Sequence, residues 1–158
     1  MYEKHTKFMK MALIEAKKAV QKAEVPIGAV LVSDSWDILS LSHNQTISLA
    51  DPTAHAEIIT LRKAAQKVSN YRLLNTTLYV TIEPCIMCMG AIVHARVSRV
   101  VFGAKDPKWG AAGSLYNFAN DTRLNYNPDI VHGVFENECR TLIQEFFRSK
   151  RRDLWLIS

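Results

Sequence analysis

Two short polar motifs, well separated in the sequence, constrain how this chain can fold. A His-x-Glu motif, His55 and Glu57, lies near the start of a segment with helical character, residues 53–67. A Pro-Cys-x-x-Cys motif, residues 84–88, comes just after residues 76–82, a run rich in β-branched residues that predicts a strand. The two motifs are separated by 26 residues. A fold that uses both must bring the starts of two helices together.

The side chains in these motifs are the parts of a hydrolytic zinc site. Such a site uses three protein ligands and leaves a fourth position open for water. In this interpretation His55, Cys85 and Cys88 are the ligands, and Glu57 is the carboxylate that moves protons. Cysteines three positions apart share a helix face, and the unpaired amides of a helix start favour their thiolate form.

Other interpretations of the motifs stay open on the residues alone. The two cysteines by themselves are also typical of a redox pair or of half a structural zinc site. A thioredoxin-like redox pair does not need a His-x-Glu motif. A closed structural site requires a fourth ligand, for which Cys139, His94 and His132 are available. We expect Cys139 to be a small buried apolar residue instead.

The alternation of strand and helix patterns predicts an α/β fold. Apolar residues at helical spacing predict a first helix over residues 3–22, and four Gly or Pro residues predict a long loop at residues 103–114. The expected strands are residues 27–32, 38–42, 76–82, 99–102 and 129–132, and the later helices are 53–67, 84–95 and 136–151. This order predicts one αβα sandwich domain over residues 1–158, with helices covering a central sheet.

The composition fits an ordinary globular chain with a basic bias. Its 158 residues are 48% hydrophobic, and no apolar run approaches the roughly 20 residues that span a bilayer. The polar N-terminus and the odd number of cysteines favour a cytoplasmic protein without disulfides. The net charge is +5. We interpret the lysines of residues 4–22 as a solvated helix face, whereas the cations of residues 148–152 either complement a helix end or bind a polyanion.

Both motifs together, in strand–helix context, match the signature of the zinc-dependent deaminases. Longer stretches are similar to one family of these enzymes, at residues 24–30, 51–57, 83–88, 101–106, 110–114 and 146–148. The sequence resembles the bacterial tRNA-specific adenosine deaminases through nearly its whole length. These enzymes convert the wobble adenosine, position 34 of a tRNA anticodon, to inosine.

The resemblance implies a cytidine-deaminase-like αβα sandwich around a five-stranded mixed sheet, and a homodimer. It also implies one zinc ion per subunit, bound by His55, Cys85 and Cys88. In the family's pattern, Glu57 is the proton shuttle of a hydrolysis that releases ammonia. The pattern therefore assigns the same metal and proton chemistry to these four residues as the motifs alone favour.

The resemblance also implies residues that contact the nucleoside. Asn44 would hydrogen-bond the flipped nucleoside, and Asp106 would contact its sugar or backbone. Without the resemblance, Asn44 would be a turn residue and Asp106 a turn initiator before proline. Three further positions would line the base pocket: Ile27, Ala54 and Pro84.

A tRNA anticodon stem-loop is the implied partner, and no membrane is implied. Its loop displays unstacked bases, which lowers the cost of placing one in a pocket. A basic rim would anchor the flanking phosphates. The candidate RNA contacts are Lys105, Lys108, Phe147, Arg148, Lys150, Arg151 and Arg152. Trp109 departs from the family's small or polar residue, and could stack on a base, pack in a dimer interface or cover the core.

Three competing functions share these motifs. The first is deamination of free cytosine, cytidine or guanine, which uses the same hydrolytic chemistry at a ring carbon. The second is a non-catalytic, zinc-stabilised RNA-binding subunit, which would not need the carboxylate of Glu57. The third, a metal-free scaffold, is disfavoured because all four site residues are present.

Overall fold

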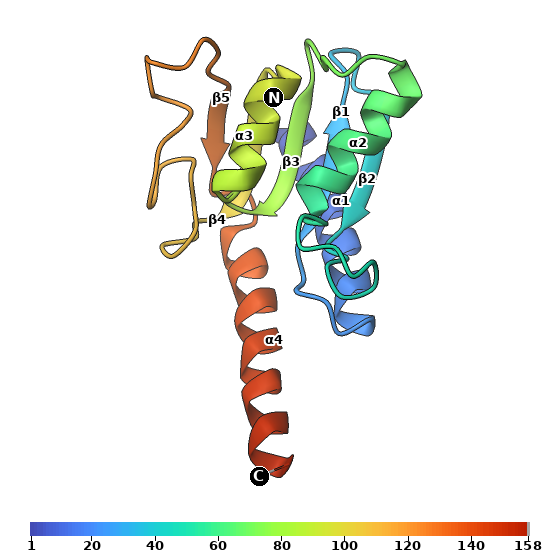
Figure 1. The fold of residues 1–158 in the computed structure, drawn as a ribbon, viewed down its shortest axis with the longest axis vertical. Helices are drawn as coiled ribbons and strands as arrows, with labels where there is room; N and C mark the ends of the chain where they lie inside the picture. Colours follow the sequence, from blue (N-terminus) through green and yellow to red (C-terminus); the bar gives the residue numbers. More distant parts are fainter. Residues whose placement is uncertain (158) are drawn as a thin grey trace.

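The computed structural model describes residues 1–157, which form a five-stranded sheet with four helices (Figure 1). The strand order is β2-β1-β3-β4-β5; β1 pairs antiparallel with β2 and β3, and β4 pairs parallel with β3 and β5. The helices are α1 (Tyr2–Gln21), α2 (Ala56–Val68), α3 (Ile86–Ala95) and α4 (Glu136–Ile157). The strands are β1 (Gly28–Val32), β2 (Ile38–His43), β3 (Thr77–Ile82), β4 (Arg99–Ala104) and β5 (Asp129–His132).

The sheet is the middle layer of an αβα sandwich. Alternate residues of a strand point to opposite faces, so Leu78 and Val80 of β3 pack with α2 and α3, whereas Tyr79 packs with α1. Both faces are covered, which explains why the central strands are apolar at consecutive positions instead of alternating with polar residues. The three-layer fold and the mixed five-stranded sheet expected from the sequence are confirmed.

The sheet topology gathers the polar segments at one edge. Because β3 and β4 are parallel, the chain leaves both strands at the same edge. The antiparallel pairings bring the beginning of β1 and the end of β2 to that edge as well. Ligand sites of open α/β sheets commonly form outside the carboxyl ends of the strands. Both sequence motifs lie at this edge, because α3 follows β3 and α2 follows the loop after β2.

Several predicted boundaries need correction. The helix expected from Thr53 begins at Ala56 with His55 as its N-cap, because Thr53 Oγ1 and N both donate to Asp51 Oδ1 at 2.8 Å and so belong to the preceding turn. Pro84 does not begin α3, which starts at Ile86 with Cys85 as its N-cap. The loop expected at residues 103–114 begins later, because β4 continues to Ala104 by pairing with β3.

The last helix differs most from its predicted length. It continues past the expected end at residue 151 to Ile157, and its second half extends away from the sandwich (Figure 1). Cys139 is 1% exposed in the core beside α1, as expected for a small buried residue. Residues 147–156 are all exposed. Within the described residues, no helix is both long enough and apolar enough to cross a membrane.

Candidate metal centre

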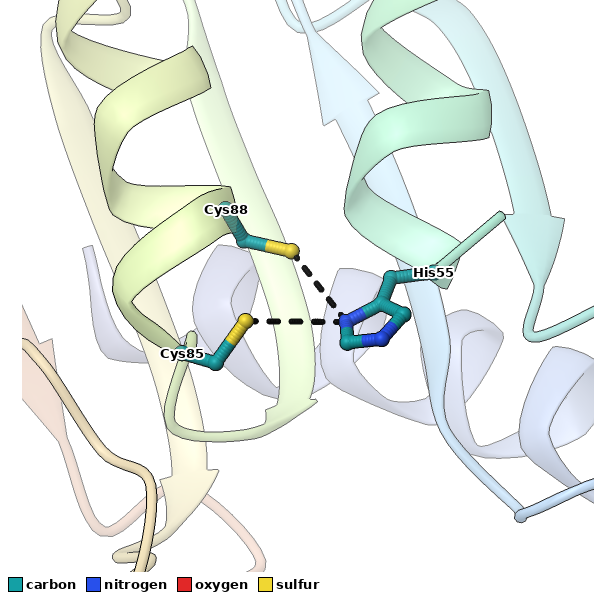
Figure 2. A group of neighbouring side chains, drawn as sticks. All are labelled: His55, Cys85 and Cys88. Carbon is teal, nitrogen blue, oxygen red and sulfur yellow. Dashed lines mark hydrogen bonds between the residues drawn. The ribbon is translucent and has the colours of Figure 1, made fainter. Parts of the chain in front are cut away.

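His55, Cys85 and Cys88 form a compact group at the polar edge of the sheet. Figure 2 shows the three side chains pointing toward one another from the starts of α2 and α3. Nδ1 of His55 lies 3.6 Å from the sulfur of Cys85 and 3.5 Å from that of Cys88. The three potential ligand atoms all lie within 4.8 Å of one another.

These distances fit a tetrahedral zinc ion. Zinc–sulfur bonds of about 2.3 Å and zinc–nitrogen bonds of about 2.05 Å place the two ligand atoms about 3.6 Å apart at a tetrahedral angle. The observed sulfur–nitrogen distances are 3.5 and 3.6 Å. A redox pair would need no imidazole between its sulfurs. Within the described residues, neither Cys139 nor a second histidine joins the group.

The local backbone explains why these three side chains converge. His55 and Cys85 are both N-cap residues in extended conformation, with ψ values of 154° and 177°. An N-cap residue lies just outside its helix, so its side chain is free of the helix surface. Cys88 follows one turn after Cys85 and returns to the same side of α3. An isolated bridge between Cys85 and Gly110 ties the first cysteine to the loop after β4.

The cysteines differ in their affinity for protons. A hydrogen bond from Cys88 is the main cause that lowers the pKa of Cys85 to about 4, although burial acts in the opposite direction. The same contact raises the pKa of Cys88, and burial raises it further. The hydrogen bond to Cys85 also raises the pKa of His55. The lowered pKa of Cys85 favours its thiolate, the form of cysteine that binds zinc.

Glu57 lies in the first turn of α2, two residues after His55, and is only 3% exposed. Its Oε1 atom has no hydrogen-bond partner among the described residues. A buried polar atom without a partner is unusual in proteins, and this oxygen is available to a further group. Burial is the main cause that raises the pKa of Glu57, and the nearby Cys85 raises it further. Its carboxyl is thus suited to gain and lose protons.

Asn44 follows β2 and lies in the polar edge beside β1. It is 4% exposed and precedes the turn that begins at Thr46. Its main-chain N–H donates to Ile27 O at 3.0 Å, and its Nδ2 donates to Glu24 Oε2 at 3.4 Å. The residue is therefore held by both its main chain and its side chain.

Asp106 lies in the loop after β4 and is half-buried. Its Oδ1 accepts from the amides of Lys108 at 3.0 Å and Trp109 at 3.3 Å, so the side chain also initiates a turn. Its own N–H donates to Glu83 Oε1 at 3.2 Å. Trp109 is 64% exposed and does not cover the core, which excludes one of its three expected roles.

The three expected pocket residues also lie at the polar edge. Ala54 and Pro84 are buried, and Ile27 is half-buried. The carbonyl of Ala54 accepts from Gln45 N at 3.0 Å, and that of Pro84 accepts from Ala111 N at 2.8 Å. Their main chains thus join the metal-binding segments to the loops after β2 and β4.

The candidate RNA contacts fall into two groups, and all are exposed. Lys105 and Lys108 flank Asp106 in the loop after β4. The others lie along the projecting half of α4, and these are Phe147, Arg148, Lys150, Arg151 and Arg152. The structure therefore gives the first pair a place beside the metal group and the second set a place on a separate helix.

Two buried carboxylates at this edge were not among the expected site residues. Glu24 is 0% exposed and Glu83 is 3% exposed. Each lies inside a stretch that carried the family resemblance, beside apolar residues and a proline. An acidic residue close to a buried strand was the available signal, because such a residue is rarely buried unless its oxygens have partners.

Comparisons with known proteins agree with this geometry. The model of the cytidine and deoxycytidylate deaminase zinc-binding region matches residues 2–104. The tRNA-specific adenosine deaminase of Haemophilus influenzae is 49% identical over 147 residues, which are 93% of this chain and 85% of that protein.

Two solved structures are also similar. One, from studies of A-to-I editing by tRNA:A34 deaminases at the wobble position of transfer RNA, has 44% identity and a TM-score of 0.84, covering 87% of this chain and 99% of that chain. Guanine deaminase of Bacillus subtilis has 39% identity and a TM-score of 0.59, covering 63% of each chain. The chain belongs to the tRNA-specific adenosine deaminase family and carries the zinc-binding region of the cytidine and deoxycytidylate deaminases.

Proposed function

We propose that this protein hydrolyses the wobble adenosine of a tRNA anticodon to inosine and releases ammonia. The observation that carries the proposal is the His55, Cys85 and Cys88 group beside the buried carboxylate of Glu57, whose Oε1 atom has no hydrogen-bond partner among the described residues. The family relatives support the choice of tRNA adenosine as the substrate. We also propose that the reaction takes place in the cytoplasm, where a tRNA substrate would be available.

His55, Cys85 and Cys88 are the proposed zinc ligands, through Nδ1 and the two sulfur atoms. When bound there, zinc supplies a Lewis acid that lowers the pKa of a coordinated water to about 7. The two helix starts hold the three ligands in place, because His55 and Cys85 are N-caps fixed by packed helices.

Glu57 is the proposed proton carrier. Hydrolysis adds water at C6 of adenine and removes the amino group as ammonia, so protons must move from the attacking water to a ring nitrogen and to the leaving group. One carboxylate suffices, because each proton that it accepts is delivered again. Burial raises the pKa of Glu57, so its carboxyl accepts a proton more readily than that of an exposed glutamate.

The substrate contacts are proposed on the same edge. Asn44 would hydrogen-bond the nucleoside, Asp106 its sugar or backbone, and the base would lie against Ile27, Ala54 and Pro84. The exposed cations beside Asp106 and along α4 would bind the flanking phosphates. We also propose a homodimer, because the segments after β2 and β4 and the start of α3 carry large exposed apolar side chains: Ile47, Leu49, Ile86, Trp109, Leu115 and Tyr116.

A second candidate function is deamination of a free base or nucleoside. The similarity to a guanine deaminase structure over 63% of the chain favours it. The features that favour a tRNA substrate over a free base or nucleoside are Asn44, the loop after β4 and the cations of α4. A free base offers no phosphates for these cations to bind.

Nucleoside analysis separates the two functions. The purified protein is incubated with an anticodon stem-loop that carries adenosine at the wobble position, and free cytidine, cytosine and guanine are incubated in parallel. We expect inosine from the stem-loop and no product from the free compounds. Product from a free compound with unchanged RNA would overturn the assigned substrate and retain the zinc chemistry.

A further inference from the structure

Two buried carboxylates lie behind the two loops that border the metal group. One loop, residues 44–51, follows β2 and begins with Asn44. The other, residues 105–114, follows β4 and contains Asp106. Glu24 lies behind the 44–51 loop and Glu83 behind the 105–114 loop, and neither has a role in the proposed metal or proton chemistry.

Glu24 accepts hydrogen bonds mainly from the 44–51 loop. Its Oε1 accepts from the main-chain N–H of Ser48 at 2.7 Å and from the Ser48 hydroxyl at 3.1 Å. Its Oε2 accepts from Asn44 Nδ2 and from the Thr46 hydroxyl, both at 3.4 Å. A carboxylate accepts only, so it fixes the NH₂ end of the Asn44 amide toward itself. The orientation of the Asn44 side chain therefore depends on Glu24.

Glu83 has the same relation to the 105–114 loop. Its Oε1 accepts from the N–H of Asp106 at 3.2 Å and from the hydroxyl of Ser114, and its Oε2 accepts from the amides of Ala112 at 3.0 Å and Ser114 at 3.1 Å. Gly110 passes so close to this carboxylate that a Cβ there would overlap it. The loop is thus folded around the side chain of Glu83.

Within the described residues, neither carboxylate forms an ion pair. The ion pairs among the described residues involve other acidic groups, including Glu15, Asp51 and Asp121, and neither Glu24 nor Glu83. A buried charge is costly unless hydrogen bonds satisfy it, and here all the donors come from the loops. Moving either loop would leave a buried charge without partners, so each carboxylate holds its loop in one conformation.

We propose that Glu24 and Glu83 are positioning residues for substrate recognition, Glu24 through Asn44 and Glu83 through Asp106. This inference rests on the proposed function, because it assigns the two loop residues to nucleoside contacts. Misplacing a contact by about 1 Å can reduce catalysis by about 100-fold. Each carboxylate thus acts on the substrate through one partner on its own loop.

Two double-mutant cycles test the proposal through kcat/KM on the wobble-adenosine stem-loop. Glu24→Gln and Glu83→Gln keep the size of the side chain and remove its charge. We expect each to lower kcat/KM by about 10- to 100-fold. Adding Glu24→Gln to a protein that already carries Asn44→Ala should change kcat/KM by less than about twofold, because Glu24 acts through Asn44. Two independent residues would instead have effects on kcat/KM that multiply. The same is expected when Glu83→Gln is added to Asp106→Ala.

The crossed pairs are the matched controls. These pairs are Glu24→Gln with Asp106→Ala and Glu83→Gln with Asn44→Ala. In each pair the two effects on kcat/KM should multiply, because the two substitutions act on different loops. Zinc content and thermal midpoint are measured for every variant. The proposal would be overturned if the effects on kcat/KM multiplied in all four pairs, the two own-loop pairs (Glu24 with Asn44, Glu83 with Asp106) included. General destabilisation would give the own-loop and the crossed pairs the same behaviour.

Milder variants keep the test valid if a Glu→Gln protein fails to fold. Ser48→Ala and Ser114→Ala each remove one hydroxyl donor to the same carboxylates. Their effects on kcat/KM should be smaller, and they should likewise not multiply with Asn44→Ala for Ser48→Ala or with Asp106→Ala for Ser114→Ala. Effects that multiply in these pairs would overturn the proposal. The wild-type assay separates the two proposals: no deamination of any substrate overturns both, whereas an active wild type with uncoupled pairs overturns only the positioning roles. If the wild type deaminates only a free nucleoside, the cycles are run on that substrate.

Discussion

Gly110 lies directly against the carboxylate of Glu83, with no room between them for a side-chain carbon. We predict that Gly110→Ala destabilises the protein by about 1–3 kcal/mol, as overpacking does, and lowers activity by displacing the 105–114 loop. Gly90 is the matched control, because it lies inside α3 with nothing within 4 Å of its added Cβ. Gly90→Ala should stabilise the helix by about 0.5–1 kcal/mol. Denaturant unfolding of both variants measures this difference, and equal effects would contradict the assigned close contact.

Removing the carboxylate of Glu57 should separate turnover from metal binding. We predict that Glu57→Gln lowers kcat by about 10²- to 10⁴-fold, the contribution of a positioned acid–base group. The variant should keep its zinc, because Glu57 is not a proposed ligand. Initial rates and metal analysis on the same preparation test this. A non-catalytic RNA-binding subunit would instead lose no function with Glu57→Gln.

Removing one sulfur should remove the metal. We predict that Cys88→Ala reduces zinc from about one ion per chain to a small fraction after dialysis, since two ligands bind zinc weakly. Cys139→Ala is the control: this buried cysteine lies in the core beside α1, outside the metal group. It should keep its zinc and lose about 1 kcal/mol of stability. Metal loss in both variants would indicate general unfolding.

The buried side chain of Glu15 should make stability depend on pH. Burial raises its pKa, but hydrogen bonds from Lys18 and His43 outweigh burial and leave the pKa below the usual 4.5. A lowered folded-state pKa stabilises the protein above about pH 4.5, and this contribution is lost as pH falls through the lowered value. The unfolding free energies of wild type and Glu15→Gln should therefore differ most near neutral pH and converge as the pH falls below the lowered pKa of Glu15. A difference that stays constant with pH would contradict this assignment.

The cations on the projecting half of α4 should contribute a salt-dependent part of RNA binding. Arg151→Gln with Arg152→Gln should weaken stem-loop binding, and should lower the slope of log affinity against log salt by about 0.7 per lost phosphate contact. The control is Lys17→Gln with Lys22→Gln, which removes the same charge from two exposed positions, one in α1 and one just after it. This control should leave the slope unchanged. Titrations at several salt concentrations measure both, and equal slopes in the two double variants would contradict the role of α4.

The sequence predicted the strands and the convergent metal group well, for a physical reason. Buried strands of an αβα sandwich are apolar on both faces, so runs such as residues 77–82 are clear in the sequence. The group of His55, Cys85 and Cys88 could be predicted because few kinds of side chain bind zinc. The starts of α2 and α3 were wrong by two or three residues, because the turn at Thr53 depends on its hydrogen bonds to Asp51.

The roles of Glu24 and Glu83 could not be predicted, because their partners are distant in the sequence. Glu24 is 24 residues from Ser48, and Glu83 is 31 residues from Ser114. Several of these donors are main-chain amides, which every residue except proline carries, so no pattern of side chains marks them. Only the folded chain shows which loop surrounds which carboxylate.

The position of His55 and Cys85 at two helix starts, 30 residues apart in the chain, has a consequence for folding. A zinc ion bound by both would cross-link the ends of a segment that contains α2 and β3. Cys85 and Cys88 are close in sequence and can capture the ion early, whereas His55 can reach it only after α2 has packed beside α3. Completion of the metal site would therefore be a late folding event, and the reactive centre would form only in chains whose two helices are already in place.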